Sequence, residues 1–214
     1  MEQNVGVNFS RKKYLILVVL LLAGLVIIVK NNRIEDAVEA TPVITNSTET
    51  PEEKTPEETG YIWRGTKSDP KRVVIPKIGV DAFIQNVGVD QHNQIAVPNN
   101  IHVAGWFVDS VIPGNDGLSI IDGHVNGVSS DKGVFKRIDE LSVGDSVQIA
   151  MGDNLIINFK VVSNQAVETA ESASVLYSQN PTIKSQLNLI TCAGNFNRTN
   201  RQYDKRQITI LERI

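Results

Sequence analysis

Cysteine is nearly missing from this chain, since Cys192 is the single one among 214 residues. One cysteine excludes an intramolecular disulfide, and no Cys-x-x-Cys or His-Glu-x-x-His pattern suggests a zinc site. A surplus of basic charge is also missing, because the formal net charge is -3 and residues 61–214 hold fifteen basic and fifteen acidic side chains. Nucleic-acid-binding proteins present a basic face, so we expect no nucleic-acid partner.

One uncharged apolar run, Tyr14–Val29, stands close to the N-terminus. As a helix it spans about 24 Å, and Lys30 snorkelling to the interface extends its reach across the bilayer. Three basic residues precede the run and favour an N-terminus on the inside. The sequence therefore predicts a short cytoplasmic segment (1–13) and a single-pass membrane anchor (14–30), with the remainder extracellular. A cleaved signal peptide is the less favoured alternative, because Val38 and Ala40 lie too far beyond the run.

The next segment, residues 31–65, is predicted to be a disordered stalk. Residues 31–60 contain no aromatic side chain, carry a surplus of acidic residues and include Pro42, Pro51 and Pro56. Such a composition buries too little apolar surface to offset the entropy lost on ordering. We expect this stalk to hold the following domain away from the membrane.

Residues 66–214 show the sequence pattern of a mostly β domain. Short β-prone runs separated by Gly, Pro and Asp predict a barrel or a sandwich. Helical signal is weak and allows a turn or two at 133–141 and 172–178. The predicted strands are 72–75, 82–87, 95–97, 103–108, 118–122, 146–151, 155–162, 187–191 and 207–212.

Three reactive side chains stand at ends of predicted strands, where a scaffold fixes position and a loop gives access. His124 follows strand 118–122, Cys192 follows strand 187–191 and Arg206 precedes strand 207–212. A thiolate attacks carbonyls, an imidazole exchanges protons near neutral pH, and a guanidinium stabilises the resulting oxyanion. These three groups are a sufficient set for acyl transfer.

Simpler interpretations of the same residues remain open. Cys192 is an ordinary buried thiol in one of them, and His124 caps a turn. His92 and His102 compete with His124 for any role. Arg198 is the second candidate for the oxyanion role, and Asp122, two residues before His124, is a candidate to orient the imidazole ring.

The motifs around these residues resemble those of sortases. The segment 188–192 (NLITC) resembles the Thr-Leu-x-Thr-Cys signature, with Asn188 in place of the first Thr. The segments 121–125 (IDGHV) and 203–208 (YDKRQI) look like the stretches that carry the sortase histidine and arginine. Residues 102–107, 113–117 and 192–198 resemble class F sortases most closely, although Arg206 falls where that class suggests an amide. The resemblance covers about residues 70–214.

The resemblance implies a closed eight-stranded sortase-type β-barrel with short helices. It implies a cysteine transpeptidase with Cys192 as nucleophile, His124 as proton-transfer group and Arg206 as oxyanion group. Some sortases have a calcium site, but the acidic residues here form no calcium-ligand pattern, so we expect no cofactor and no metal. The expected partners are surface proteins with a C-terminal sorting signal of the Leu-Pro-x-Thr-Gly kind and an amine acceptor, either a peptidoglycan precursor or a pilin. Rival functions are a hydrolytic cysteine endopeptidase of the same fold, a pilin polymerase and a non-enzymatic anchored binding module.

Overall fold

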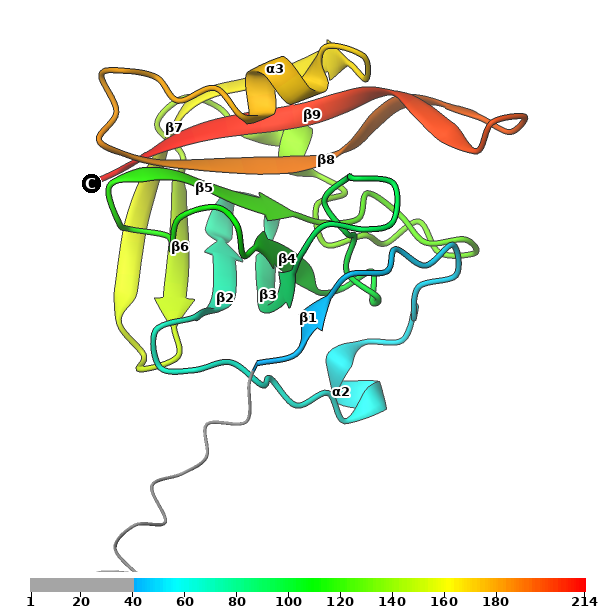
Figure 1. Ribbon diagram of the computed structural model, residues 1–214, viewed down its shortest axis with the longest axis horizontal. Helices are drawn as coiled ribbons and strands as arrows, with labels where there is room; N and C mark the ends of the chain where they lie inside the picture. The colour runs from blue at the N-terminus through cyan, green and yellow to red at the C-terminus, as the bar shows by residue number, and fades with distance from the viewer. Residues whose placement is uncertain (1–40) are drawn as a thin grey trace, which may run out of the picture. The chain divides into compact units, whose positions relative to one another are not determined.

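The computed structural model describes residues 41–214 (Figure 1). The predicted cytoplasmic segment, the predicted anchor 14–30 and the first part of the predicted stalk lie outside the described residues. Within residues 41–214, no helix combines the length and the apolar character needed to cross a membrane.

Eight strands close into a barrel in the order β3-β2-β6-β7-β9-β8-β5-β4, and the parallel pairing of β4 with β3 completes the ring. This confirms the predicted eight-stranded barrel. A ninth strand, β1, adds two residues to β3. The strands are β1 (Val43–Ile44), β2 (Pro70–Ile75), β3 (Val80–Val87), β4 (Ala104–Phe107), β5 (Gly117–Asp122), β6 (Ser146–Met151), β7 (Ile156–Glu168), β8 (Ser185–Asn197) and β9 (Gln202–Arg213).

The helices are short, as the weak helical signal predicts. They are α2 (Pro56–Thr59), α3 (Ser172–Leu176) and two 3-10 turns, η1 (Pro76–Ile78) and η2 (Ile138–Glu140). A capping box begins α2: the Thr55 hydroxyl accepts from the Glu58 backbone N–H, and the Glu58 carboxylate accepts from the Thr55 N–H. The predicted strand 95–97 is wrong, because Ile95 makes only an isolated bridge with Val89.

Alternating side chains along the strands build two apolar clusters on opposite faces of the sheet. Ile121 and Leu189 belong to the larger cluster, which fills the barrel. Ile120 and Ile190 belong to the smaller cluster on the outer face, together with Leu176 of α3. Figure 1 shows α3 lying against β8 and β9. Asp122 lies two residues after Ile120 in β5, and Cys192 lies two residues after Ile190 in β8. Because residues i and i+2 of a strand point to the same face, Asp122 and Cys192 also lie on this outer face.

The predicted disordered stalk differs from the structure over residues 41–65, where the chain packs on the barrel. β1 pairs with β3, and Trp63 Nε1 donates to the Ile84 carbonyl over 2.9 Å. Glu52 exchanges backbone hydrogen bonds with the loop before β4, donating to Asn99 over 2.8 Å and accepting from Ile101 over 2.9 Å. These contacts are made by backbone and by single side chains, which is why composition alone did not predict them.

Candidate active site

Cys192 and Arg206 are cross-strand partners in the hairpin formed by β8 and β9. Both strands continue past the predicted boundaries, so the two residues lie inside strands and not at their ends. Directly opposed residues of an antiparallel pair project from the same face, with Cα atoms about 5 Å apart. A half-buried free thiol therefore has a guanidinium as its lateral neighbour.

His124 is tied to the strand that carries Cys192. β5 runs parallel to β8 with Asp122 opposite Ile190, and the Gly123 N–H donates to the Ile190 carbonyl over 3.1 Å. The buried Thr191 hydroxyl donates to the Gly123 carbonyl over 2.7 Å. The threonine that precedes the cysteine thus connects the strand of the thiol to the residue before the histidine.

Glycine is required at position 123 because the backbone passes against the core. A Cβ atom there would meet Val134 Cγ1 and Phe135 Cδ2 at 2.6 Å, closer than side-chain atoms approach one another. Any other residue at position 123 would therefore push the chain away from the core directly before His124.

The His124 ring makes one hydrogen bond, from Nε2 to the Pro98 carbonyl oxygen over 2.6 Å. A carbonyl only accepts, so Nε2 carries the proton and Nδ1 is the nitrogen left to take one in the neutral ring. Burial lowers the pKa of His124 below its usual 6.5, and the bond to Pro98 opposes this shift in part. The resting imidazole is therefore neutral at pH 7.

The Cys192 thiol is also held in its neutral form. Burial raises its pKa above the usual 9.0, Arg206 acts in the opposite direction, and Asp122 adds to the rise. Since the raised pKa favours the neutral thiol, the nucleophile has to lose its proton during the attack and is not stored as a thiolate.

Arg206 is anchored through one end of its guanidinium. Nη1 donates to the carbonyl oxygens of Lys205 over 2.9 Å and Tyr203 over 3.2 Å and to the Thr169 hydroxyl over 3.1 Å. The Thr169 hydroxyl in turn donates to Tyr203 O over 2.9 Å. Nε and Nη2 make no hydrogen bond to the described residues, so these donors are available to a charge that develops at Cys192.

Arg198, the alternative oxyanion candidate, lies in the exposed turn between β8 and β9. It lines a cavity of about 520 Å³ that also contains His124, Asn126 and Tyr203. The structure therefore places Arg206, and not Arg198, opposite Cys192 in the sheet, and places Arg198 on the side of His124.

Asp122 is buried, with 8% of its surface exposed, and within the described part of the chain its side chain makes no hydrogen bond to His124. The hypothesis that it orients the ring by a direct bond is therefore not supported, and the Pro98 carbonyl provides the contact. Asp122 Oδ1 lies against Gly105, where any side chain would collide with it. Burial raises the pKa of this carboxyl well above its usual range, so burial favours its protonated form.

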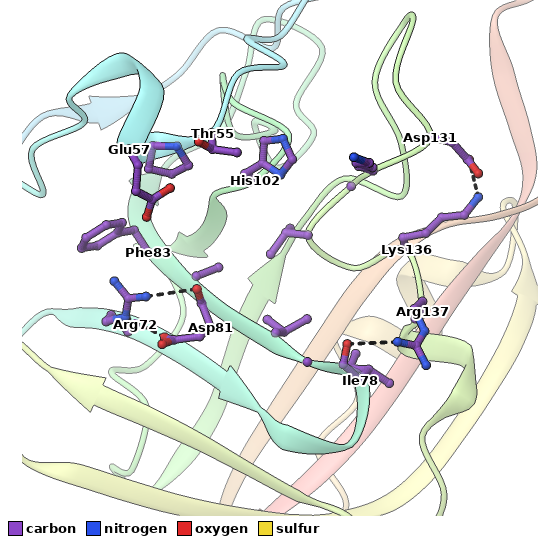
Figure 2. Close-up of a pocket in the computed structure, with 17 residues that line it drawn as sticks. Thr55, Glu57, Arg72, Ile78, Asp81, Phe83, His102, Asp131, Lys136 and Arg137 are labelled. Atoms are coloured by element: carbon purple, nitrogen blue, oxygen red, sulfur yellow. Dashed lines mark hydrogen bonds and ion pairs between the residues drawn. The ribbon is translucent and has the colours of Figure 1, made fainter.

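The other two histidines lie away from the three candidate residues. His92 is exposed in a turn, and His102 Nε2 contacts the Glu53 carbonyl oxygen over 3.1 Å. Figure 2 shows His102 in a separate cavity of about 560 Å³ that contains none of Cys192, His124 and Arg206. No group of three or more potential metal ligands occurs among residues 41–214.

Sequence reasoning missed two contributors to the site. Pro98, which fixes the His124 tautomer, acts through its backbone carbonyl, and a loop carbonyl leaves no signal in sequence. Thr169, which holds Arg206, lies between β7 and α3, far along the chain from the motif it supports.

Replacing Thr191 by valine is expected to reduce the free energy of unfolding by about 1–3 kcal/mol, because the buried Gly123 carbonyl loses its side-chain donor. Urea unfolding followed by circular dichroism measures the change. Thr191→Ser keeps the hydroxyl and serves as the matched control. A valine variant as stable as the serine variant would show that the bond contributes nothing.

Replacing Asp122 by asparagine is expected to change how stability depends on pH. The folded carboxyl keeps its proton while the unfolded one loses it above about pH 3.9, so wild-type stability falls by about 1.4 kcal/mol per pH unit from there up to the folded pKa. The amide does not titrate, so the variant lacks this pH dependence. The difference in the free energy of unfolding between variant and wild type therefore grows with pH at that slope. Parallel slopes in urea titrations between pH 4 and 8 would show that Asp122 titrates normally.

The Sortase domain family model matches residues 73–214, more than half of the chain. The chain therefore belongs to the sortase family and is, in general class, a sortase-type transpeptidase. No curated protein sequence matches it.

Solved sortase structures share the fold. Sortase C-1 from Actinomyces oris is 22% identical, with 84% of this chain and 91% of that chain covered and a TM-score of 0.53. A Clostridium perfringens Sortase D5 transpeptidase is 26% identical, with coverages of 75% and 89% and a TM-score of 0.51. A lid mutant of Sortase A from Corynebacterium diphtheriae is 19% identical, with coverages of 71% and 73% and a TM-score of 0.52. These belong to classes A, C and D, so the resemblance to class F stays a prediction.

Proposed function

We propose that this protein is a cysteine transpeptidase that cleaves a sorting signal of the Leu-Pro-x-Thr-Gly kind and transfers the protein to a cell-wall amine. The observation that supports this most directly is the pairing of Cys192 with Arg206 across β8 and β9, beside a His124 that Thr191 and Gly123 tie to the same strand. The residues proposed as nucleophile and oxyanion group are thus opposed in register, and the proposed proton carrier follows β5, the neighbour of β8.

In the first half-reaction, Cys192 Sγ attacks the carbonyl carbon of the scissile peptide bond. The thiol proton passes to His124 Nδ1, and the developing oxyanion accepts from the free donors of Arg206. Collapse breaks the C–N bond, and His124 gives the proton to the leaving amine. The product remains bound to the enzyme as a thioester.

The outer apolar cluster supports a groove for an extended peptide. Ile190 stands two residues before Cys192 on the same face of β8, and Leu176 of α3 is packed into this cluster. Asn188 Nδ2 donates to the Leu176 carbonyl over 2.7 Å, which holds α3 against β8. The departure from the Thr-Leu-x-Thr-Cys signature at Asn188 thus contributes a hydrogen bond to this wall, and a leucine of the sorting signal is the side chain that suits it.

We also propose that the enzyme acts at the outer face of the cell membrane. The support is the sequence of residues 14–30 and the basic residues before them, which suit a single-pass anchor with its N-terminus inside. Surface proteins with a C-terminal sorting signal would meet the enzyme there, and the amine of a peptidoglycan precursor is the expected acceptor.

The test uses the full chain in detergent micelles with a library of Leu-Pro-x-Thr-Gly peptides and an added amine, analysed by mass spectrometry beside Cys192→Ala. The expected result is a peptide–amine product that depends on Cys192. Cleavage without transfer would favour the hydrolytic endopeptidase, and transfer only to a lysine of a second protein would favour a pilin polymerase. No product, together with a thiol that resists alkylation, would leave a non-enzymatic binding module.

A further inference from the structure

The cavity beside His124 is lined by none of the residues of the outer apolar cluster. Three segments line this cavity: the loop after β5, the turn between β8 and β9 with the residues next to it, and residues 48–51 of the N-terminal segment. Tyr203 donates from its hydroxyl to Asn126 Oδ1 over 3.1 Å, and the rings of Phe196 and Tyr203 pack with centroids 5.1 Å apart. The cavity is therefore a recess of about 520 Å³ lined by both polar and apolar side chains, with His124 among them.

One cation in this recess is left unneutralised. Arg201 Nη1 pairs with Glu49 Oε2 at 2.5 Å, whereas Arg198 has no ion-pair or hydrogen-bond partner among residues 41–214. In the second cavity, three of the four Lys and Arg side chains are paired. Figure 2 shows the pairs Arg72–Asp81 and Lys136–Asp131. Arg137 pairs with Glu140. The recess at His124 thus favours a ligand that brings a negative charge.

The chemistry of thioester release indicates which ligand suits the recess that contains His124. An incoming amine must reach the carbonyl carbon from the site that the leaving amine vacated, where His124 handles the proton. The neutral amine nitrogen attacks the thioester carbon, the C–S bond breaks, and the amine proton passes through His124 to the departing sulfur. A recess that contains His124 is therefore suited to the acceptor.

We propose that this recess binds the acceptor amine and that Arg198 selects acceptors with a carboxylate next to the reacting amine, as in an amino acid of the diaminopimelate type. This inference rests on the proposed transpeptidase function. The guanidinium of Arg198 pairs with the carboxylate and brings the amine beside His124. Amines on a plain alkyl chain lack this contact and react more slowly.

The test is a competition, again with the full chain and a Leu-Pro-x-Thr-Gly peptide. Mono-N-acetyl-diaminopimelate competes with Nα-acetyl-lysine, which lacks the carboxylate beside its free amine, and mass spectrometry gives the product ratio. We expect wild type to favour the former by about five- to tenfold, as for one partly exposed charged hydrogen bond. Arg198→Ala should abolish most of this preference and Arg198→Lys should keep part of it. Lys184→Ala, which removes an exposed cation paired with Asp116, should match wild type.

Two results would overturn the inference: equal ratios in wild type and Arg198→Ala, or a wild type without preference. Mass spectrometry of the protein without acceptor separates this failure from failure of the proposed function. An acyl adduct on Cys192 with an unchanged ratio rejects the acceptor site alone, whereas neither adduct nor product rejects the transpeptidase and the inference with it.

Discussion

Replacing Arg206 by alanine is expected to lower kcat/KM for peptide cleavage by about 100- to 1,000-fold, the usual cost of losing an oxyanion donor. The expectation follows from the register of β8 and β9, which places the guanidinium opposite Cys192, and from the Nη1 contacts that fix it. Removing the cation also raises the thiol pKa, since Arg206 is the group that lowers it. Initial rates with a fluorogenic sorting-signal peptide measure the loss.

Arg213 provides the matched control for this substitution. It lies on the same strand, is exposed, and donates from Nη1 to the Gly114 carbonyl over 2.6 Å, at the end of β9 away from Cys192. Arg213→Ala should therefore change stability more than kcat/KM. If Arg198→Ala reproduced the full loss of peptide cleavage while Arg206→Ala did not, Arg198 would be the oxyanion group and the assignment of Arg206 would be wrong.

The barrel was predictable because its strands alternate apolar and polar residues or form short apolar runs. The predicted strand 146–151 coincides with β6, and the prediction of β5 misses only Gly117. β8 and β9 were cut short because residues 193–206 are mostly polar and their few apolar side chains do not alternate regularly. Their pairing continues beyond the barrel through backbone hydrogen bonds, which any sequence can form.

The candidate site was predictable in its residue types and only partly in its geometry. The motifs around Cys192, His124 and Arg206 locate the three groups, but the contacts that position them involve the Pro98 carbonyl and the Thr169 hydroxyl, from distant loops. Asp122 shows the opposite problem. Its place two residues before His124 suggests a partner for the ring, yet its side chain lies against Gly105, and burial there raises its pKa.

Replacing His124 by alanine is expected to lower kcat/KM for peptide cleavage by about 100- to 10,000-fold, since both the thiol and the leaving amine then lack a proton carrier. Wild-type activity should follow a bell-shaped pH profile. Its acid limb should lie below the usual histidine pKa of 6.5 because burial lowers the pKa of His124, and its alkaline limb above 9.0 because burial raises that of Cys192. The variant should lose the acid limb.

A substrate with an ester in place of the scissile amide distinguishes proton transfer by His124 from a structural role. The leaving alcohol needs a proton less than an amine does, so His124→Ala should impair ester cleavage much less than amide cleavage. A merely structural role would impair both equally. His92→Ala, which removes an exposed imidazole from a turn, is the control and should leave both rates as in wild type. An acid limb that persists in His124→Ala would mean that another group carries the proton.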